Sequence, residues 1–368
     1  MTHPIDKIKV LIVDDSSVIR LLFKKILSSD PEIEVVGSAP DPYAARDLLV
    51  QLRPDVMTLD IEMPKMNGLD FLQKVMEHFP TRAVVVSSLT QAHAPHALRA
   101  LELGALDVMA KPEVSVGSNL EEAGRELIEK VKAAARSKVN RVRRPVTPLN
   151  ASTPDLKDGE LFRVGTGPIL ALAASTGGTE ALKEVLMKLP AHIPPTVIVQ
   201  HMPPLFTKQY ADSLSKVCAF PVREAKQGDR LTSGTVLLAP GNYHLRLNRV
   251  TGGYVETHLT QESLLHGVRP AADYMLESVA RLVGPEAVGA VLTGMGKDGA
   301  RGLLAMRERG AWILAQDEAS CAVFGMPREA IEIGAVDRVV SLDQMAEALQ
   351  SSLEKKGWKR FLAQSNAA

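Results

Sequence analysis

Short apolar segments alternate with helical patterns through the first 135 residues, and this alternation restricts the fold more than any other feature of the sequence. Apolar residues spaced four apart predict a helix directly after the first segment, IKVLIV at 8–13. Further strands are predicted near 33–38, 55–59, 83–87 and 106–109, separated by helices near 41–52, 68–78, 93–103 and 119–135. Such an order requires an α/β fold in which helices cover both faces of a parallel sheet.

The second half of the chain repeats this layer order after an interruption. Residues 136–168 are rich in Arg, Pro, Ser and Thr without an apolar period, and they predict a linker. From 169 to 353, strands near 169–174, 196–200, 286–292 and 311–315 alternate with helices near 178–189, 204–216, 298–309 and 342–353. Short strand patterns with turns at 222–260 predict a short antiparallel addition to this second, doubly wound α/β domain. Residues 354–368 are predicted to form a C-terminal tail.

Charge and cysteine content exclude several functional classes. Lys plus Arg and Asp plus Glu both number 43, so the net charge is zero, whereas a large nucleic-acid surface needs an excess of cations. The 2 cysteines are too few for a disulfide framework or a cysteine-built zinc site, and they favour a cytoplasmic protein. No apolar run approaches the roughly 20 residues that cross a bilayer, so the chain is predicted not to be embedded in a membrane.

Acidic residues end the first and third predicted strands. Asp14 and Asp15 follow the first apolar segment, and Asp60 follows the third. These strands are neighbours in a sheet of order 2-1-3-4-5, so the three carboxylates are expected to meet at one edge. Clustered acids repel one another, and a hard cation such as Mg2+ relieves that repulsion. Asp60 can then act as a nucleophile that forms an acyl phosphate.

Two residues that end later strands fit the same site. Lys111 follows the fifth strand and offers a positive charge to a phosphoryl group, and Ser87 ends the fourth strand with a hydroxyl. With these five residues in order, the first 135 residues resemble the response-regulator receiver family, which has a flavodoxin-like fold.

The receiver resemblance implies phosphorylation at Asp60, with Ser87 and Lys111 as switch residues. It also implies a Mg2+ site formed by Asp14 (through water), Asp15, Asp60 and the backbone carbonyl of Glu62. One position departs from the family pattern: Val108 stands where Tyr or Phe is usual, three residues before the lysine. An aromatic rotamer switch is therefore not expected here.

A serine ends the first strand of the second domain. In ILALAASTGGTE, residues 169–180, Ser175 lies where the strand gives way to a glycine-rich helix start. Backbone N–H groups at a helix N-terminus can stabilise an oxyanion, which makes Ser175 a candidate nucleophile. Ser175 can equally be a simple helix N-cap, because its surroundings are not the G-x-S-x-G elbow.

His201 and Asp298 offer partners for this serine. His201 follows the predicted strand TVIVQ at the same sheet edge, and Asp298 lies in the glycine-rich segment VLTGMGKDGARG. An acid in that position can orient the imidazole and stabilise its cation. Each residue taken alone also has a structural explanation.

The glycine-rich segment has a rival interpretation as a dinucleotide site. Residues 294–299 match G-x-G-x-x-G after a strand, and Asp317 follows the next strand, where a ribose-binding acid would lie. Two features weigh against it: Asp298 would lie beside the pyrophosphate, and the unit is not the first strand–helix turn of its domain.

The second half resembles the catalytic domain of the chemotaxis protein-glutamate methylesterases, the CheB family. The matching segments, in order, are AASTGG at 173–178, QHMP at 200–203, LLAPGNYH at 237–244, RPAAD at 269–273 and LTGMGKDGA at 292–300. This resemblance implies that Ser175 is the nucleophile, His201 the general base and acid, and Asp298 the residue that orients the histidine. It also implies an oxyanion donor in the backbone N–H of Met295 and a positioning role for Thr176.

The implied activities are hydrolysis of glutamate methyl esters on methyl-accepting chemotaxis receptors and deamidation of certain receptor glutamines. The ester reaction needs no cofactor. The implied partners are the receptors, as substrate, and a chemotaxis histidine kinase, as phosphodonor. The implied location is the cytoplasm, with recruitment to membrane receptor arrays. Phosphorylation of Asp60 is expected to relieve a receiver domain that obstructs the catalytic crevice.

A binding-module alternative is a receiver-coupled nucleotide- or DNA-binding regulator. Basic residues between Arg136 and Arg144 in the linker are compatible with contacts to nucleic acid. Such a regulator needs a helix-turn-helix after the linker, and the strand-rich second half predicts none. We therefore predict no nucleic-acid partner.

Overall fold

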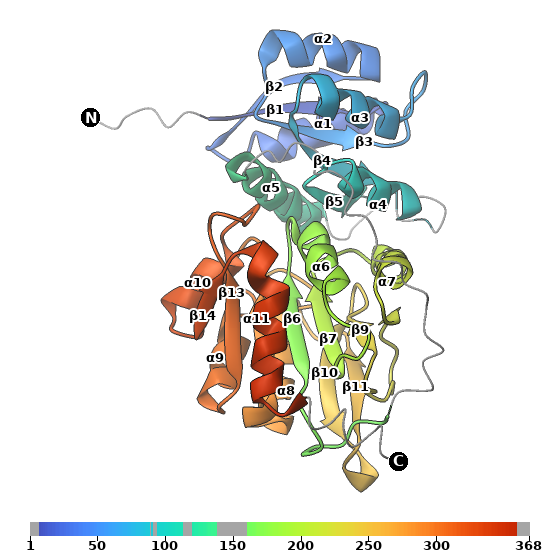
Figure 1. Ribbon diagram of the computed structural model, residues 1–368. Helices are drawn as coiled ribbons and strands as arrows, with labels where there is room; N and C mark the ends of the chain where they lie inside the picture. Colours follow the sequence, from blue (N-terminus) through green and yellow to red (C-terminus); the bar gives the residue numbers. More distant parts are fainter. Residues whose placement is uncertain (1–6, 89, 91–93, 113–119, 138–159, 359–368) are drawn as a thin grey trace, which may run out of the picture. The chain divides into compact units, whose positions relative to one another are not determined.

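The computed structural model describes residues 7–88, 90, 94–112, 120–137 and 160–358 (Figure 1). The chain divides into two compact units, residues 1–145 and 146–368. The narrower domain limits, 1–135 and 169–353, stay predictions. Most of the predicted linker and tail, and the basic run after Arg136, lie outside the described residues.

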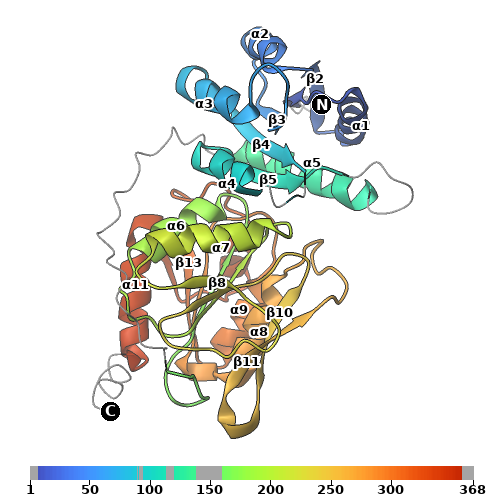
Figure 2. The same ribbon diagram turned by 90° about the vertical axis from the view of Figure 1, so that its right-hand side faces the viewer.

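The first unit contains a five-stranded parallel sheet of order β2-β1-β3-β4-β5, which confirms the predicted fold. Helices α1 and α5 contact each other, whereas α2, α3 and α4 form a second group of neighbours (Figure 2). Its elements are β1 (Ile8–Val13), α1 (Ser17–Leu27), β2 (Ile33–Ala39), α2 (Pro42–Leu52), β3 (Val56–Asp60), α3 (Gly68–His78), β4 (Arg82–Ser87), α4 (Ala94–Glu102), β5 (Asp107–Ala110) and α5 (Leu120–Arg136).

Burial explains why the strands of this unit are continuous apolar runs. Both faces of the sheet are covered, so β1 and β3 carry apolar residues at successive positions and not only at alternate ones. Helix α1 buries Ile19, Phe23 and Leu27 at four-residue spacing against the core. The parallel register pairs Val13 with Leu59, which brings the carboxyl ends of β1 and β3 together.

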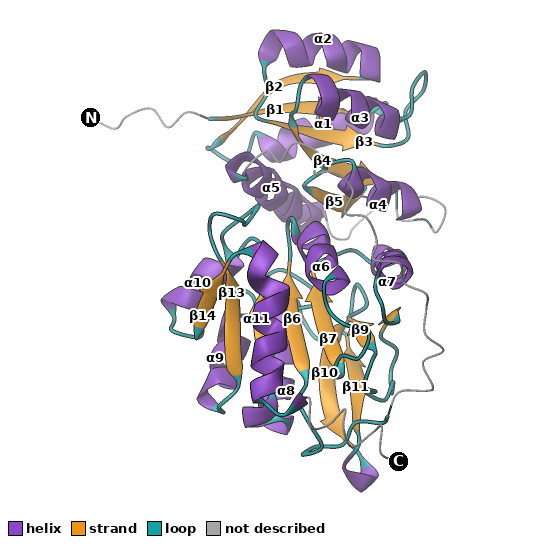
Figure 3. Cartoon of the chain, in the orientation of Figure 1, coloured by secondary structure: helices purple, strands orange, loops and turns teal. Residues whose placement is uncertain are grey.

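The second unit contains a seven-stranded parallel sheet of order β14-β13-β12-β6-β7-β9-β8. In Figure 3 the strands are orange, and β6 and β7 lie side by side in this sheet. Helix α6 contacts α7 and α11, while α9 contacts α8 and α10. The elements are β6 (Leu170–Ala174), α6 (Gly178–Met187), β7 (Thr196–Gln200), α7 (Phe206–Val217), β8 (Val222–Glu224), β9 (Val236–Leu238), β10 (His244–Arg249), η1 (Thr251–Gly253), β11 (Val255–Thr260), α8 (Ala272–Leu282), η2 (Gly284–Glu286), β12 (Val288–Val291), α9 (Ala300–Glu308), β13 (Trp312–Gln316), α10 (Met326–Glu332), β14 (Arg338–Val340) and α11 (Leu342–Lys355).

The predicted antiparallel addition is present as a separate two-stranded sheet of β10 and β11. It covers only part of the stretch in which it was predicted. Strand β9 pairs in parallel with both β7 and β8, so residues 222–238 extend the large sheet. These strands have 3 residues each, too few for periodicity to separate parallel from antiparallel pairing.

The register of the central strands determines which residues meet at the edge of the second sheet. Ala173 pairs with Val199 on one side and with Val291 on the other, so β6 lies between β7 and β12. The residues that follow these three strands therefore come together at their carboxyl ends, the edge at which parallel α/β sheets bind ligands.

Candidate functional site

The first unit gathers three carboxylates at the edge of its sheet. Asp14, Asp15 and Asp60 each offer an oxygen, and these oxygens lie within 4.8 Å of one another. Asp14 and Asp60 are buried, whereas Asp15 is exposed. The predicted cluster therefore forms, although the residues come from two separate strand ends.

Lys111 joins the two buried acids. Its Nζ lies 2.8 Å from an Asp60 oxygen and 3.0 Å from an Asp14 oxygen. Burial raises the pKa of both carboxyls, and the hydrogen bonds from Lys111 offset this only in part. Burial acts to lower the pKa of Lys111, but its bonds to Asp60 and Asp14 outweigh that effect and the pKa is raised.

The donor set of this cluster fits a hard divalent cation. The ligand atoms are carboxylate oxygens, two of them on acids whose charge is disfavoured by burial, and a cation would stabilise that charge. Glu62, the remaining predicted ligand, lies in the loop after Asp60 and donates its backbone N–H to Asp60 Oδ1 at 3.2 Å. The residues therefore fit Mg2+.

The other predicted positions of this unit lie on the two strands beyond β3. Ser87 is fully buried at the end of β4, and its hydroxyl has no hydrogen-bond partner within the described part of the chain. Its carbonyl accepts the backbone N–H of Lys111 at 2.8 Å. Val108 is buried within β5, so the position that is usually aromatic in receivers here belongs to the core.

Ser175 lies at the carboxyl end of β6, in the turn that leads into α6. Its backbone N–H donates to the carbonyl of Thr293 at 3.0 Å, which ties the turn to the neighbouring strand β12. The helix N-cap is Gly177 in the left-handed region, without a side-chain hydrogen bond. The side chain of Ser175 is therefore not used as the N-cap, and the capping alternative is wrong.

His201 and Asp298 form a close pair beside this turn. His201 is the residue after β7, as Ser175 is the residue after β6, and its backbone N–H donates to Ala174. His201 Nε2 lies 2.7 Å from Asp298 Oδ2. An ionised carboxylate only accepts hydrogen bonds, so Nε2 is the donor in this pair, and Nδ1 is the ring nitrogen that Asp298 does not engage.

The N-terminus of α8 holds the Asp298 carboxylate. The backbone N–H groups of Ala272, Asp273 and Gly299 donate to its two oxygens at 2.6, 3.1 and 2.9 Å. Burial acts to raise the pKa of Asp298, but His201 and the hydrogen bonds from the N–H groups of Ala272 and Asp273 outweigh it and lower that pKa. Asp298 is thus held as a buried anion against the imidazole.

The glycine-rich turn after β12 borders the serine. A Cβ on Gly294 would lie 2.8 Å from the Cβ of Ser175, so only glycine permits this approach. The backbone N–H of Met295, one residue further on, donates no hydrogen bond among the described residues. The Ser175 N–H is already bonded to Thr293, so it is not available to an oxyanion. Thr176 is buried, and its carbonyl accepts the hydroxyl of Thr293 at 3.0 Å.

Two family models match the chain. The model described as CheB methylesterase matches residues 170–349, and the response regulator receiver domain model matches residues 10–117. A protein-glutamate methylesterase/protein-glutamine glutaminase of Bdellovibrio bacteriovorus is 52% identical over 350 residues, covering 95% of this chain and 98% of its own. This chain belongs to the CheB methylesterase family.

A second relative and a solved structure are also similar to this chain. A protein-glutamate methylesterase/protein-glutamine glutaminase 2 of Pseudomonas aeruginosa is 47% identical over 350 residues, covering 95% of this chain and 98% of its own. The crystal structure of the Thermotoga maritima CheB methylesterase catalytic domain is 38% identical, with a TM-score of 0.49, and covers 50% of this chain and 97% of that one.

The geometry gives the dinucleotide alternative no support. Asp298 is turned inward to His201 and the start of α8. Asp317, the supposed ribose ligand, accepts hydrogen bonds from the backbone N–H and the hydroxyl of Ser320, at 3.0 and 2.5 Å. Both acids are therefore used within the fold.

Sequence reasoning missed several residues that contact the predicted ones. Gln200 donates to the carbonyls of Ser175 and His201. Asp273 is buried behind Asp298 and lies 2.9 Å from Nε2 of His266. Both Gln200 and Asp273 fall inside the family-like segments QHMP and RPAAD, which was the available signal.

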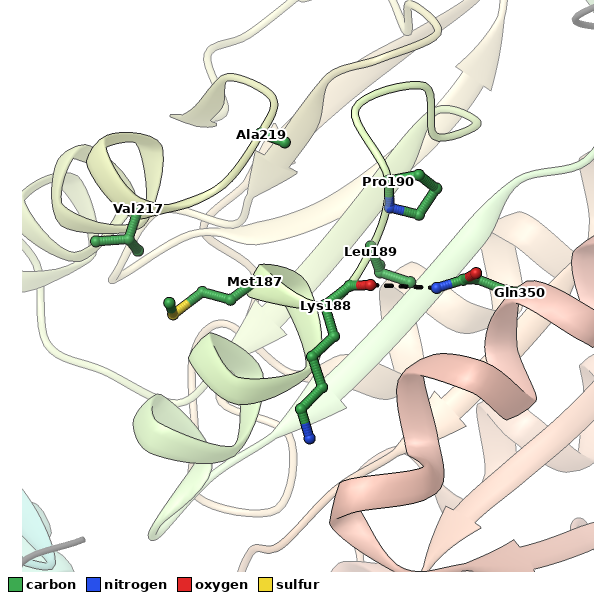
Figure 4. A pocket seen from close by; sticks show the side chains of 7 residues that line it. All are labelled: Met187, Lys188, Leu189, Pro190, Val217, Ala219 and Gln350. Carbon is green, nitrogen blue, oxygen red and sulfur yellow. Dashed lines mark hydrogen bonds between the residues drawn. The ribbon is translucent and has the colours of Figure 1, made fainter. Parts of the chain in front are cut away.

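A hollow of about 270 Å3 lies elsewhere on the second unit (Figure 4). It is lined by the ends of α6 and α7 together with Gln350 of α11, whose side chain donates to the carbonyl of Lys188 at 3.2 Å. None of the predicted catalytic residues lines it. Among the helices of the described ranges, none is both long and apolar enough to span a membrane.

Proposed function

We propose that this chain hydrolyses glutamate methyl esters on methyl-accepting chemotaxis receptors, deamidates receptor glutamines, and is controlled by phosphorylation of Asp60. The observation that carries the proposal is the His201–Asp298 pair, with 2.7 Å between Nε2 and Oδ2, beside a serine that directly follows the adjacent strand. Relatives with the methylesterase/glutaminase name across 95% of the chain support the choice of substrate.

The proposed mechanism is acyl transfer through Ser175. Nδ1 of His201 accepts the proton of the Ser175 hydroxyl as Oγ attacks the side-chain carbonyl carbon of the substrate. The carbonyl oxygen becomes an oxyanion, and the unengaged N–H of Met295 is the proposed donor to it. His201 then returns the proton to the leaving group, which departs as methanol from an ester or as ammonia from an amide.

Water completes the cycle. His201 removes a proton from it, the resulting hydroxide attacks the acyl carbon, and Ser175 leaves with that proton, which releases glutamate. In both steps the imidazolium lies against the buried anion of Asp298, whose charge stabilises it without proton transfer. Thr176, with its backbone fixed by Thr293, is the proposed neighbour that helps to position the histidine.

Phosphorylation is proposed to use the acidic cluster of the first unit. Asp15, Asp60 and the carbonyl of Glu62 would hold Mg2+, with Asp14 contributing through water, and the bound ion would neutralise the charge of an incoming phosphoryl group. Asp60 is the proposed phosphoryl acceptor, Lys111 pairs with the new charge, and the unpartnered hydroxyl of Ser87 turns towards it. A chemotaxis histidine kinase is the proposed phosphodonor, in the cytoplasm at receptor arrays.

Methanol release from methylated receptors tests the proposal. We expect Ser175→Ala to lower turnover by at least roughly 10³-fold, the scale of losing a triad member. Asp60→Asn should keep basal turnover and lose its response to a phosphodonor. Near-normal esterase activity in Ser175→Ala would contradict the proposed nucleophile, and a phosphodonor response in Asp60→Asn would contradict the proposed control.

A further inference from the structure

We propose that Gln200 is a positioning residue that holds the nucleophile and the general base in register. The inference rests on the proposed function, because it assigns a role relative to Ser175 and His201. Gln200 is the last residue of β7, and it pairs with Ala174, the last residue of β6. It therefore lies one residue before the base and opposite the residue before the nucleophile.

The side-chain amide of Gln200 joins the two catalytic backbones. Its Nε2 donates to the carbonyl of Ser175 at 2.9 Å and to the carbonyl of His201 at 3.1 Å. The bond between β6 and β7 nearest to the site is the one from the His201 N–H to Ala174, at 3.2 Å. One residue further on, the Ser175 N–H donates to Thr293, which follows β12, and not to β7. The side-chain amide of Gln200 therefore supplies a hydrogen bond between the ends of β6 and β7 where the backbone forms none.

The start of α6 leaves space for this amide. A Cβ on Gly178 would lie 2.2 Å from Gln200 Oε1, so any larger residue would displace the amide. Gly178 also donates its N–H to the Ser175 carbonyl at 2.6 Å, which means that the carbonyl receives two donors. The serine turn is thus fixed from the helix and from the neighbouring strand at once.

A purely space-filling role does not account for the choice of glutamine. The side chain is 2% exposed, and its Oε1 has no hydrogen-bond partner in the described ranges. A buried, unpaired polar atom costs free energy that an apolar side chain of similar length avoids. An apolar side chain would lack the two hydrogen bonds that Nε2 donates. Both of these hydrogen bonds go to the backbone carbonyls of proposed catalytic residues.

Replacement of the donors tests this role. In Gln200→Met, which keeps the length of the side chain, we expect kcat to fall roughly 10-fold or more, because small misplacements of catalytic groups are costly. KM for methylated receptor should stay within about twofold, because the side chain of Gln200 is buried. The rate at which a small fluorophosphonate labels Ser175 should fall in parallel with kcat.

Thr196→Val is the matched control. Thr196 is buried at the start of the same strand, at the end remote from the site. The substitution removes one hydrogen bond, which the Thr196 hydroxyl donates to the carbonyl of Pro194 at 2.9 Å. The labelling rate and kcat of Thr196→Val should stay at wild-type values, even if its melting temperature falls by as much as that of Gln200→Met.

The outcomes separate this inference from the proposed function. If Gln200→Met keeps the labelling rate and kcat of the wild type, or loses no more than Thr196→Val, the positioning role is overturned and the proposed function is unaffected. Failure of the wild type to label would instead overturn Ser175 as nucleophile. If Gln200→Met does not fold, Gln200→Leu provides the same comparison, because its apolar side chain cannot donate a hydrogen bond; full activity in that variant also overturns the role.

Discussion

Buried carboxylates carry both sites of this protein, but their surroundings act in opposite directions. Burial raises the pKa of Asp60, and the nearby charge of Asp14 adds to this, while Lys111 offsets it only in part. Asp298 is surrounded by hydrogen-bond donors, and its pKa is lowered. The first arrangement leaves an anion that needs a cation, whereas the second provides a permanent anion for an imidazolium.

These shifts predict opposite effects of amide substitution at neutral pH. The pKa of Asp60 is raised in the folded protein above its ordinary value of 3.8, so the free energy of unfolding falls as the pH rises from 3.8 through the pKa of the folded protein. At neutral pH the ionised Asp60 therefore destabilises the first unit, and the uncharged side chain in Asp60→Asn should stabilise it. The pKa of Asp298 is lowered in the folded protein, so its ionised form stabilises the second unit above pH 3.8, and this stability is lost as the pH falls through the pKa of the folded protein. Asp298→Asn should therefore destabilise the second unit at neutral pH.

Hydrogen exchange read by mass spectrometry measures each unit separately. We expect each change in the free energy of unfolding to be about 1 kcal/mol or more, the scale of hydrogen bonds to charged groups. Added Mg2+ should protect the first unit of the wild type more than that of Asp60→Asn. Loss of protection in Asp60→Asn at neutral pH without Mg2+ would contradict this account.

Sequence reasoning identified residues whose chemistry is visible at a strand end. Asp14, Asp60, Ser175 and His201 all follow apolar runs, and parallel pairing alone brings each pair together. Gln200 carries no charge or nucleophile, and its role depends on where its amide points after folding. The same is true of the α8 N-terminus, which reaches Asp298 from 26 residues away.

At the scale of elements, long amphipathic segments were predictable and short ones were not. Helix α8 contains buried Asp273 and Ser278 between its apolar residues, which weakens the helical pattern in the sequence. Strand β14 and helix α10 have 3 and 7 residues, below the length at which periodicity is informative. The fold could be predicted from the long helices and the strands of both sheets, because these elements carry most of the buried apolar residues.

The loop from β3 to α3 depends on a glycine. A Cβ on Gly68 would lie 2.3 Å from the carbonyl oxygen of Asp60, where a backbone atom cannot easily move away. Gly68→Ala should therefore destabilise the first unit by about 1–3 kcal/mol, as overpacking does, and slow phosphorylation at Asp60. Urea unfolding and phosphodonor labelling measure the two effects.

Gly124→Ala is the control for this loop. It lies inside α5, and its nearest contact would be a side-chain carbon of Ile26 at 3.4 Å. Alanine in a helix interior is favoured over glycine by up to about 1 kcal/mol, so this variant should be neutral or more stable. Equal losses in both variants would show that the approach of Gly68 to Asp60 is not the cause.

At the scale of the whole molecule, each of the two units has its own buried core. One core is built on β1, β3 and β4, and the other on β6, β7 and β12. The acidic cluster and the His201–Asp298 pair each lie wholly within one unit. The two groups of side chains therefore come from separate units.

Removal of the first unit tests how the phosphorylation signal acts. If the receiver obstructs the catalytic crevice, deletion of residues 1–135 should raise basal methanol release several-fold, with kcat/KM rising towards the value of the phosphorylated full-length chain. The labelling rate of Ser175 by a small fluorophosphonate serves as the control, because a small reagent is less hindered than a receptor and should change less. An unchanged or lower methanol release, with labelling of Ser175 intact, would mean that the receiver activates the esterase directly instead of inhibiting it.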